Sequence, residues 1–305
     1  MRRVGIALLG VTALCALLAP WLAPNPPDRR FPDLLYAPPT PIHAVDAHGT
    51  MPHAHAWHVV SRIERRFEED VTQRGPLLLL GADAYGRDSF SRLLHGARTT
   101  LTLALCATLA ATLLGALIGG IAGYAGGWVD AVLSRVSEFV LVLPAVYVAL
   151  ALRAVMPLVL PASQVFALLL AIFALLGWPI VARGVRAIVA SEREREYAIA
   201  ARAAGASASR VLLQHLMPAA GGYLRTQATL LLPAFILAEA TLSYVGLGFP
   251  DTTPTWGTML QEAANVALLG DTPWSLSPAA AIFVVVLGVN LVVQGTGRAP
   301  VQLEP

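Results

Sequence analysis

The sequence predicts an all-α integral membrane protein with six transmembrane helices, and three observations support this fold class. Of its 305 residues, 56% are hydrophobic and 13% are charged, whereas soluble domains have roughly 25% charged residues. Six apolar stretches approach or exceed the roughly 20 residues that a helix needs to cross a bilayer. The arginines gather in the segments on one side of these stretches. A soluble enzyme is therefore excluded.

The predicted spans begin near the N-terminus and continue almost to the end of the chain. They cover residues 4–23, 99–123, 132–154, 165–182, 228–248 and 278–293. Arg2 and Arg3 precede the first stretch, as they would in a signal peptide. However, the apolar run is longer than a signal core, and "LLAPWLAP" offers no good cleavage site. The sequence therefore predicts that the first span is an uncleaved anchor.

Arginine placement predicts the orientation, because short cytoplasmic loops carry an excess of basic residues. With the N-terminus inside, Arg153 is the arginine that falls in a short external loop. Loops beyond about 60 residues are exempt from this bias, so the arginines of the long segment after the first span carry no weight. Both termini are predicted to be cytoplasmic, on the same side as Arg2, Arg3, Arg135, Arg183, Arg186, Arg193, Arg195, Arg202, Arg210, Arg225 and Arg298.

These spans divide the chain into four parts. Residues 1–23 form an N-terminal transmembrane anchor, and residues 24–98 form an extracytoplasmic loop that ends in an amphipathic entry helix. Residues 99–295 form a core of five transmembrane helices with a cytoplasmic hairpin at 191–218, and residues 296–305 form a cytoplasmic tail. The long loop begins proline-rich and becomes charged, so we expect it to form a small structured unit.

The ionisable residues exclude several kinds of chemistry. All 21 basic residues are arginine, so the chain has no Walker A lysine for nucleotide phosphates and no Schiff-base lysine. A net charge of +2 is too small to indicate nucleic acid binding. Cys15 and Cys106 lie in apolar runs and are expected as buried hydrophobic residues, without a disulfide or a metal site. If the protein works with ATP, another chain must hydrolyse it.

The segment before the fifth span predicts a helix with a face of small side chains. Ser191 and Glu194 have the spacing of a capping box, so a helix should begin near Glu192. Gly205 suits the left-handed position that ends such a helix. One face of the helix then carries, at helical spacing, Tyr197, Ala200, Ala201 and Ala204.

A second short helix is predicted after the glycine. It can start at Ser207 or Ser209 and should stop before Pro218. Such a hairpin could lie on anionic lipid as an amphipathic surface element. It could also dock a partner protein, and the alanine face favours docking because helices on membrane surfaces usually carry large apolar residues.

This hairpin resembles the EAA signature of ABC-importer permeases, in the form found in the dipeptide, oligopeptide and nickel importer group. Ile199 stands where that signature usually has its glutamate. In the family, this hairpin is the coupling helix that sits in a groove of the ATPase subunit. The resemblance therefore implies ATPase-coupling roles for the matching residues: Glu196, Tyr197, Ala200, Ala201, Arg202, Gly205, Ala206, His215 and Pro218.

Two further blocks resemble the same group, "GADAYGRDSFSRLLHGARTTL" before the second span and "ILAEATLSYVGLGFPDTTPTWGTML" around the end of the fifth. In the first block, Asp88 is expected to cap a helix that lies along the outer membrane face before it turns in. In the second, Glu239 lies within an apolar run, which implies either a polar partner that packs the helices or a water-lined path. The candidate pathway or gate residues are Asp83, Arg87, Asp88, Glu239, Ser243 and Trp256.

By this resemblance, the chain is the second, C-type permease of a pair, a binding-protein-dependent inner membrane component with a type I ABC-importer (MetI-like) fold. It is expected to be a permease and not an enzyme, with no catalytic residue and no cofactor of its own. The implied partners are a second homologous permease, two ABC ATPase subunits that bind the ATP, an extracytoplasmic solute-binding protein and the membrane lipid. Peptides are the expected cargo across the bacterial inner membrane, and nickel, an opine or another small solute is the alternative.

Other interpretations fit the sequence less well. The long loop contains His43, His48, His53, His55 and His58, and imidazole binds nickel, copper and zinc. However, "HAHAWH" has no carboxylate to orient the rings, so a solvated loop is predicted. A self-sufficient channel or carrier would show paired charges at mid-membrane, and a membrane enzyme would show convergent His, Asp or Glu within the helices. Apart from Glu239, the spans carry almost no such residues.

Overall fold

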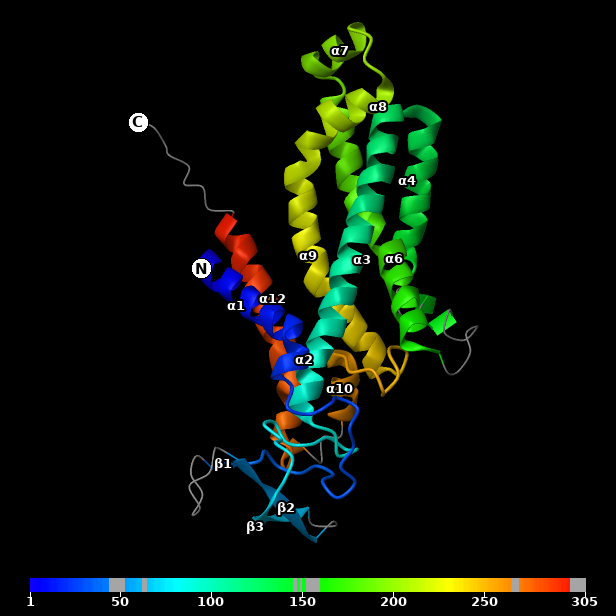
Figure 1. The fold of residues 1–305 in the computed structure, drawn as a ribbon. Coiled ribbons are helices and arrows are strands. Elements are labelled where there is room, and N and C mark those ends of the chain that lie inside the picture. The colour runs from blue at the N-terminus through cyan, green and yellow to red at the C-terminus, as the bar shows by residue number, and fades with distance from the viewer. Residues whose placement is uncertain are drawn as a thin grey trace. The chain divides into compact units, whose positions relative to one another are not determined.

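The computed structural model of the chain describes residues 1–43, 53–61, 65–144, 147–148, 150–151, 160–264 and 269–296 (Figure 1). The described chain is mostly helical. It forms two compact units: unit 1 contains Met1–Leu101 and Glu239–Val292, and unit 2 contains Thr102–Ala238 and Val293–Pro305. Three residues used in the sequence predictions, His48, Arg153 and Arg298, lie outside the described residues.

Long helices supply unit 2. It takes residues from α3 (Ser89–Ala125), α4 (Gly127–Val142), α6 (Ala162–Glu192) and α9 (Met217–Tyr244). Glycines of α3 permit a close approach to α6, because a Cβ at Gly119 would lie 2.3 Å from the carbonyl oxygen of Ala182. A Cβ at Gly115 would lie 2.7 Å from the carbonyl oxygen of Trp178. Small residues at such contacts let membrane helices pack backbone against backbone.

Unit 1 contains helices from both ends of the chain. They are α1 (Arg2–Leu17), α2 (Ala19–Leu22), α10 (Trp256–Glu262), the short helix η2 (Pro273–Leu276) and α12 (Ser277–Thr296). In Figure 1, α1 and α12 lie side by side. A Cβ at Gly5 would lie 2.6 Å from the carbonyl oxygen of Gly288, so this helix pair also touches through glycines.

The loop after α2 contains an antiparallel sheet, so the all-α prediction needs correction there. The strands are β1 (Ile42–His43), β2 (His53–Ser61) and β3 (Arg66–Arg74), in the order β1-β2-β3. Trp57 lies opposite Glu69 and Val59 opposite Phe67. Trp57 and Phe67 pack against a small buried cluster of Leu34, Ala37, Leu78 and Ala82. The charged and histidine-rich strands form because this apolar cluster covers one side of them. The expectation of a small structured loop is confirmed.

Four helices within the described residues are long and apolar enough to cross a membrane. They cover Ser89–Ala125, Ala162–Glu192, Ala208–Tyr244 and Pro273–Gln294. α1 and α4, which match the first and third predicted spans, each have 16 described residues. α4 ends at Val142 because Leu143 precedes Pro144, and a residue before proline disfavours the helical conformation.

α3 corrects the prediction of a separate entry helix. The helix runs for 37 residues from Ser89, so the stretch expected to lie along the membrane face is the first part of the same helix that contains the predicted span 99–123. The expected turn would require a break near Thr99, and Thr99 instead donates its hydroxyl to the carbonyl of His95 one turn earlier. The backbone ladder stays continuous there.

The predicted boundaries between 191 and 218 were also wrong in two places. α6 continues through Glu192 because its apolar face, including the fully buried Val185 and Val189, keeps it packed. The next helix, α7, covers Glu196–Ala203 and has no side-chain cap, so the capping box at Ser191 does not form.

The predicted helix end before Pro218 is the second error. α8 (Ala208–Arg210) and the π-helical turn η1 (Val211–Leu216) lead into α9 without a break, and one helix spans Ala208–Tyr244. The wide π turn already shifts the backbone hydrogen bonds. Pro218 follows directly as the second residue of α9, so its missing N–H falls next to hydrogen bonds that the π turn has already shifted.

Candidate functional site

The hairpin segment, residues 191–218, is held by a glycine turn. Gly205 has φ of +81°, a left-handed conformation that strains other residues. Its N–H donates to the Arg202 carbonyl at 3.0 Å, and the Ala206 N–H donates to the Ala201 carbonyl at 3.1 Å. This pattern closes the end of α7 and confirms the predicted role of Gly205 in the turn.

The small-residue face of α7 is exposed. Ala198 is fully buried, and α7 packs against η1, where Val211 and Leu216 are also buried. Tyr197, Ala200 and Ala204, by contrast, are exposed. Of the other residues matched to the signature, Ala201 and Ala206 are half-buried, and the exposed ones are Glu196, Arg202, His215 and Pro218.

Arginines tie the hairpin segment to its neighbours in unit 2. The Arg202 guanidinium donates to the carbonyl of Arg193 at 2.9 Å, which links α7 to the end of α6. The Arg193 guanidinium donates to the carbonyls of Gly123 and Tyr124 at 3.2 and 3.3 Å. These carbonyls belong to the last turn of α3, where a positive charge is favourable because carbonyls at a helix end lack partners.

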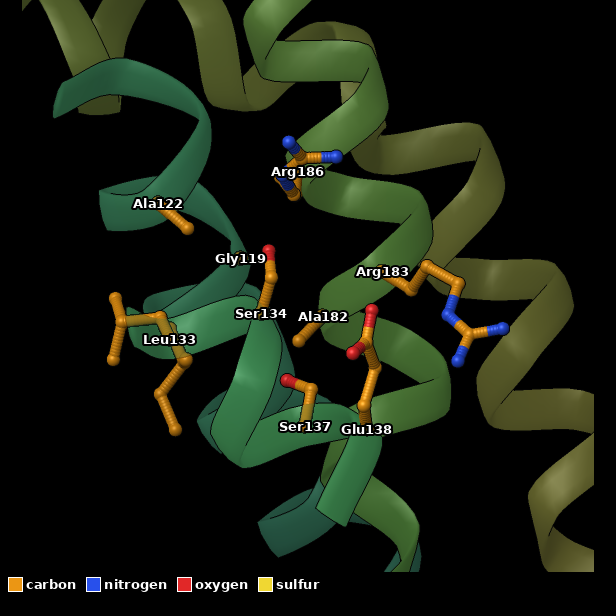
Figure 2. A pocket seen from close by; sticks show the side chains of 10 residues that line it. Gly119, Ala122, Leu133, Ser134, Ser137, Glu138, Ala182, Arg183 and Arg186 are labelled. Atoms are coloured by element: carbon orange, nitrogen blue, oxygen red, sulfur yellow. The ribbon is translucent and has the colours of Figure 1, made fainter. Parts of the chain in front are cut away.

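A pocket of about 440 Å³ lies among α3, α4 and α6 (Figure 2). In Figure 2, Ser134, Ser137 and Glu138 of α4 point toward the part of α6 that carries Ala182. Its lining residues are Ile118, Gly119, Ala122, Leu133, Ser134, Ser137, Glu138, Ala182, Arg183 and Arg186. The pocket thus combines hydroxyl groups, one carboxylate and guanidinium groups with small apolar side chains.

Arg186 anchors one side of this pocket. Its guanidinium binds Asp130 with both Nε and Nη2, the latter at 2.5 Å from Oδ2. Ser134 donates to the same carboxylate at 3.3 Å. The bidentate pair fixes α4 against α6 at this point, because a guanidinium and a carboxylate match in plane and spacing.

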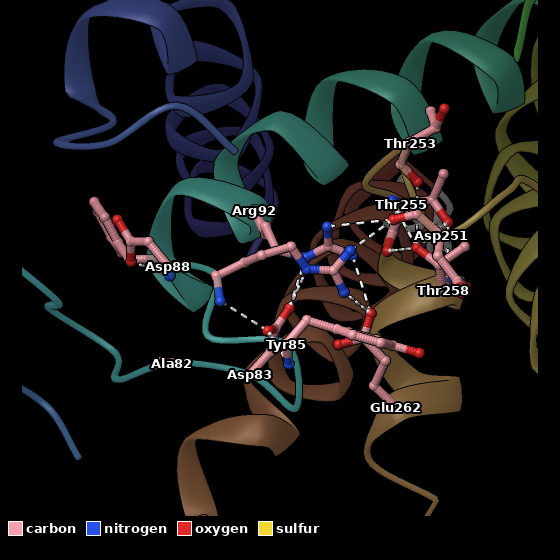
Figure 3. Close-up of polar contacts among 12 residues, drawn as sticks. Ala82, Asp83, Tyr85, Asp88, Arg92, Asp251, Thr253, Thr255, Thr258 and Glu262 are labelled. Atoms are coloured by element: carbon pink, nitrogen blue, oxygen red, sulfur yellow. Dashed lines mark hydrogen bonds and ion pairs between the residues drawn. The ribbon is translucent and has the colours of Figure 1, made fainter. Parts of the chain in front are cut away.

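Four charged residues, two of them fully buried arginines, lie together in unit 1 (Figure 3). We call Asp83, Arg87, Arg92 and Glu262 the ion cluster. Arg87 Nε lies 2.6 Å from Asp83 Oδ2, and Arg87 Nη2 lies 2.6 Å from Glu262 Oε1. Arg92 Nη2 also donates to Glu262, at 3.1 Å. Both arginine side chains are at most 1% exposed, and the two carboxylates beside them offset the cost of burying their charge.

The ion cluster joins two of the sequence blocks. Asp83 and Arg87 precede α3, Arg92 lies in its first turn, and Glu262 ends α10, two residues after the second block. Arg87 also donates to the backbone carbonyl of Asp251 at 2.9 Å. Sequence reasoning missed Glu262, although it is the one acidic residue between Asp251 and Asp271. Two arginines that become buried need carboxylates beside them, and Glu262 is one of these carboxylates.

Glu262 carries an unusual pKa. Burial raises the pKa of its carboxyl from 4.5 to about 7. The positive charges of Arg92 and Arg87 oppose this rise, and the negative charge of Asp83 adds to it. The carboxyl therefore exchanges its proton near neutral pH, where an ordinary glutamate stays ionised.

Asp88 caps α3, as predicted. Its Oδ1 accepts from the Phe90 N–H at 3.0 Å, and its Oδ2 accepts from the Ser91 hydroxyl at 2.6 Å and from Asn25 Nδ2 at 3.0 Å. The side chain is fully buried, and its hydrogen-bond partners are Asn25 and the first turn of α3. The Asp88 side chain thus caps a helix, whereas the side chains of Asp83 and Arg87, with which the sequence grouped it, belong to the ion cluster.

Glu239, Ser243 and Trp256 come together around Thr100. The Ser243 hydroxyl donates to Glu239 Oε1 at 2.7 Å, and the Thr100 hydroxyl donates to Glu239 Oε2 at 3.2 Å. The Thr100 hydroxyl accepts in turn from the backbone N–H of Trp256 at 3.1 Å. A Cβ at Gly257 would lie 2.8 Å from Ala240 Cα, so α10 contacts this end of α9 closely. Glu239 is thus buried with hydroxyl partners, and Thr100 is a member that sequence reasoning missed.

The histidines of the long loop show no metal centre among the described residues. His43 and His53 are register partners on β1 and β2, and His58 lies further along β2. Among the side chains that the structure describes, no group of three or more His, Cys, Asp or Glu could hold a metal ion. That set includes His58, whereas the side chains of His43, His48, His53 and His55 lie outside it.

Comparison with known proteins gives consistent matches. The di/tripeptide transport system permease protein DppC of Pseudomonas aeruginosa is 32% identical over 292 residues, which cover 95% of this chain and 84% of that protein. The dipeptide transport system permease protein DppC of Alkalihalophilus pseudofirmus is 36% identical over 216 residues, 70% of this chain and 68% of that protein. A Brucella ovis permease protein is 37% identical over 216 residues, 70% of each chain.

A family model agrees with these relatives. The model described as "Binding-protein-dependent transport system inner membrane component" matches residues 115–299, which is more than half of the chain. Its match includes the hairpin segment and the pocket, and the apolar helices α3, α6, α9 and α12 suit a multi-pass protein of the inner membrane. The chain therefore belongs to the family of binding-protein-dependent transport system inner membrane components.

Proposed function

We propose that the chain is one of two homologous permease subunits of an ATP-binding-cassette importer that carries peptides into the bacterial cytoplasm. Relatives named as di/tripeptide and dipeptide permeases support the peptide cargo. The observation that carries the proposal is the exposed face of α7, where Tyr197, Ala200 and Ala204 are accessible beside the Gly205 turn. Small side chains let the backbone of a second protein approach closely.

The proposed topology has six spans with both termini in the cytoplasm. The helices α3, α6, α9 and α12 supply four of them, α1 with α2 supplies the first, and α4 begins the third. The parts of the chain are then an anchor (1–23), an extracytoplasmic loop (24–98), a core (99–295) and a cytoplasmic tail (296–305). The arginines of the hairpin segment support its placement in the cytoplasm.

The hairpin segment is proposed to sit in a groove of an ABC ATPase. Two such ATPases would bind and hydrolyse ATP, since this chain has no lysine for a phosphate loop. No cofactor is proposed for the chain itself. ATP-driven closure of the ATPases would push on α7 and switch the pore between inward- and outward-facing states.

The pocket of unit 2 is proposed as part of the path for the cargo. Peptides carry an ammonium at one end and a carboxylate at the other, and the pocket wall offers Glu138 and Arg183 as groups of opposite charge. Asp83, Arg87 and Asp88 are proposed to hold the segments that receive the solute from an extracytoplasmic binding protein. Glu239, Ser243 and Trp256 are kept as gate candidates that their shared hydroxyl network would hold in one position.

Disrupting the hairpin turn is expected to uncouple transport from ATP hydrolysis. Gly205→Trp cannot adopt the turn without strain, and Ala201→Arg places a large charged side chain beside the exposed face. Both variants should reach the membrane in normal amounts but lose substrate-stimulated ATP hydrolysis in the reconstituted complex. Gly221→Ala is the control, because a Cβ there meets no atom within 4 Å. Normal stimulation in both variants would show that the hairpin does not couple the ATPases.

The assembled complex also identifies the cargo. Co-purification of the chain with two ATPases and a second permease is expected, and transport by this chain alone would contradict the proposal. The solute bound by the associated binding protein should be a peptide. A nickel ion or another small solute in its place would keep the architecture and correct the cargo.

A further inference from the structure

Tyr223 of α9 contacts the backbone of α6 through its hydroxyl group. The hydroxyl donates to the carbonyl of Ile180 at 3.0 Å and accepts a hydrogen bond from the N–H of Gly184. These two backbone groups are four residues apart, so they are partners in the ladder of an α-helix. The tyrosine therefore binds both groups of one rung of α6.

Gly184 makes this contact possible. A Cβ built at Gly184 would lie 2.0 Å from Tyr223 Cζ, 2.2 Å from its Oη and 2.5 Å from its Cε1. No real side chain tolerates such distances, so even alanine at this position would displace the ring. The Tyr223 ring therefore occupies the space that a side chain at position 184 would fill.

The contact lies beside an interruption in the ladder of α6. Pro179 is inside the helix and has no N–H, so it leaves the carbonyl of Leu175 without its usual partner. Two rungs of α6 whose carbonyls are five positions apart are therefore modified: the Leu175 carbonyl lacks its donor, and the Ile180–Gly184 rung is shared with Tyr223. Helices bend at such places.

The modified part of α6 around Pro179 lies between elements that connect to the hairpin segment and to the pocket. α6 enters the hairpin segment and α9 leaves it, so Tyr223 links the two helices that carry the hairpin. Ala182, Arg183 and Arg186, which line the pocket, follow Pro179 on the side toward the hairpin. A bend at Pro179 would move this wall of the pocket.

We propose that Tyr223 is a positioning residue for the transport cycle: it clamps α6 to α9 so that a displacement of the hairpin segment moves both helices together and swings the pocket wall about Pro179. This inference rests on the proposed function. Another explanation for the same contact is that a tyrosine hydroxyl needs a hydrogen-bond partner where it is partly buried. The two explanations differ in what happens when the hydroxyl alone is removed.

Tyr223→Phe keeps the ring on Gly184 and removes the two hydrogen bonds. If Tyr223 clamps the helices, the number of peptides imported per ATP hydrolysed should fall roughly five-fold, the ratio that corresponds to a hydrogen bond of about 1 kcal/mol. The amount of assembled complex and its basal ATP hydrolysis should stay the same. A purely structural contact would lower the yield of complex and leave the ratio unchanged.

Gly184→Ala tests the same clamp from the other helix. The alanine should displace the ring and lower the ratio as Tyr223→Phe does, and the double variant should show no further loss, since both changes break one contact. The controls are Gly222→Ala, where a Cβ meets no atom within 4 Å, and Tyr244→Phe, an exposed tyrosine on the same helix. Independent, additive losses for Tyr223→Phe and Gly184→Ala would overturn the proposal.

A distance measurement tests the clamp without any cargo. Spin labels at Ala187→Cys on α6 and Thr226→Cys on α9, both exposed sites, report on the separation of the two helices in the assembled complex after Cys15 and Cys106 are replaced. The parent should give one narrow distribution of distances between the two labels, and the whole distribution should shift on addition of ATP and vanadate. Tyr223→Phe should broaden it at least about two-fold.

An unchanged distribution in Tyr223→Phe would refute the clamp even if peptides are imported. Conversely, a complex that imports no peptide but shows the broadened distribution would refute the cargo and leave the clamp in place. The two proposals therefore fail in distinguishable ways.

Discussion

Glu262 shows how one side chain can make unit 1 sensitive to pH. It accepts hydrogen bonds from Arg87 and Arg92, yet burial raises the pKa of its carboxyl from 4.5 to about 7. The folded chain therefore binds this proton more tightly than the unfolded chain does between those two values. The stabilisation of the folded chain by the proton on Glu262 is therefore fully present below pH 4.5 and is lost as the pH rises through 7.

Replacing Glu262 by glutamine should remove this pH dependence. Between about pH 5 and pH 8, the parent is expected to lose stability on the order of 1–3 kcal/mol more than Glu262→Gln as the pH rises. The thermal midpoint of the detergent-solubilised chain, followed by tryptophan fluorescence, measures the difference. Glu138→Gln is the control, because the Glu138 carboxylate is 56% exposed. Equal pH slopes in the parent and Glu262→Gln would contradict the assignment.

Glycine contacts decide which helices can pack together. Gly115 and Gly119 bring α3 against α6, and Gly5 brings α1 against α12. In lipid, apolar side chains gain little from leaving one apolar surface for another, so close packing supplies much of the association. The α1–α12 contact is thus a direct indication that the first helix is an integral part of unit 1.

A larger side chain at Gly5 should therefore destabilise unit 1. Gly5→Leu forces α1 away from Gly288, at a cost of about 1–3 kcal/mol for overpacking. Gly10→Leu, on the same helix, is the control because a Cβ there meets no atom within 4 Å. The thermal midpoint should fall for Gly5→Leu and change little for Gly10→Leu. Equal effects of the two changes would show that the helix contact contributes nothing.

The helices also show which sequence signals were sufficient to predict where a helix begins or ends. Gly205 and Asp88 were predicted correctly because their roles depend on a few neighbouring residues: a left-handed turn and a helix cap. The capping box at Ser191 failed because the burial of α6 extended that helix past it. Pro218 failed as a helix end because the preceding π turn, which no local propensity indicates, shifts the backbone hydrogen bonds and lets the helix continue through it.

Contacts between residues far apart in the chain could not be predicted from the sequence. Glu262 lies 175 positions from Arg87, and Tyr223 lies 43 positions from Ile180. Their residue types fit many environments, and only the folded chain brings the partners together. The sheet of residues 42–74 was missed for a similar reason: β2 is rich in histidine, β3 is rich in charge, and Trp57 and Phe67 of these strands pack on a cluster whose residues come from before and after them in the sequence.

For the whole chain, the distribution of arginines predicts which segments lie on each side of the membrane. Under the proposed topology, the exposed Ile199 of the hairpin segment faces the cytoplasm and the exposed His58 of β2 faces outward. In a background without Cys15 and Cys106, Ile199→Cys should react with a membrane-impermeant maleimide only after the cells are opened. His58→Cys should react in intact cells. Labelling of Ile199→Cys in intact cells would invert the proposed orientation.

The unbroken length of α3 has a consequence for the surrounding lipid. Its 37 residues span roughly 55 Å at about 1.5 Å per residue, whereas the hydrocarbon core of a bilayer is about 30 Å thick. Because there is no break at which α3 could fold onto the surface, it must lean away from the bilayer normal or project into the headgroups and water. The thickness of the host membrane is therefore expected to set the tilt of this helix, and a thinner or thicker bilayer to change how much of it is solvated.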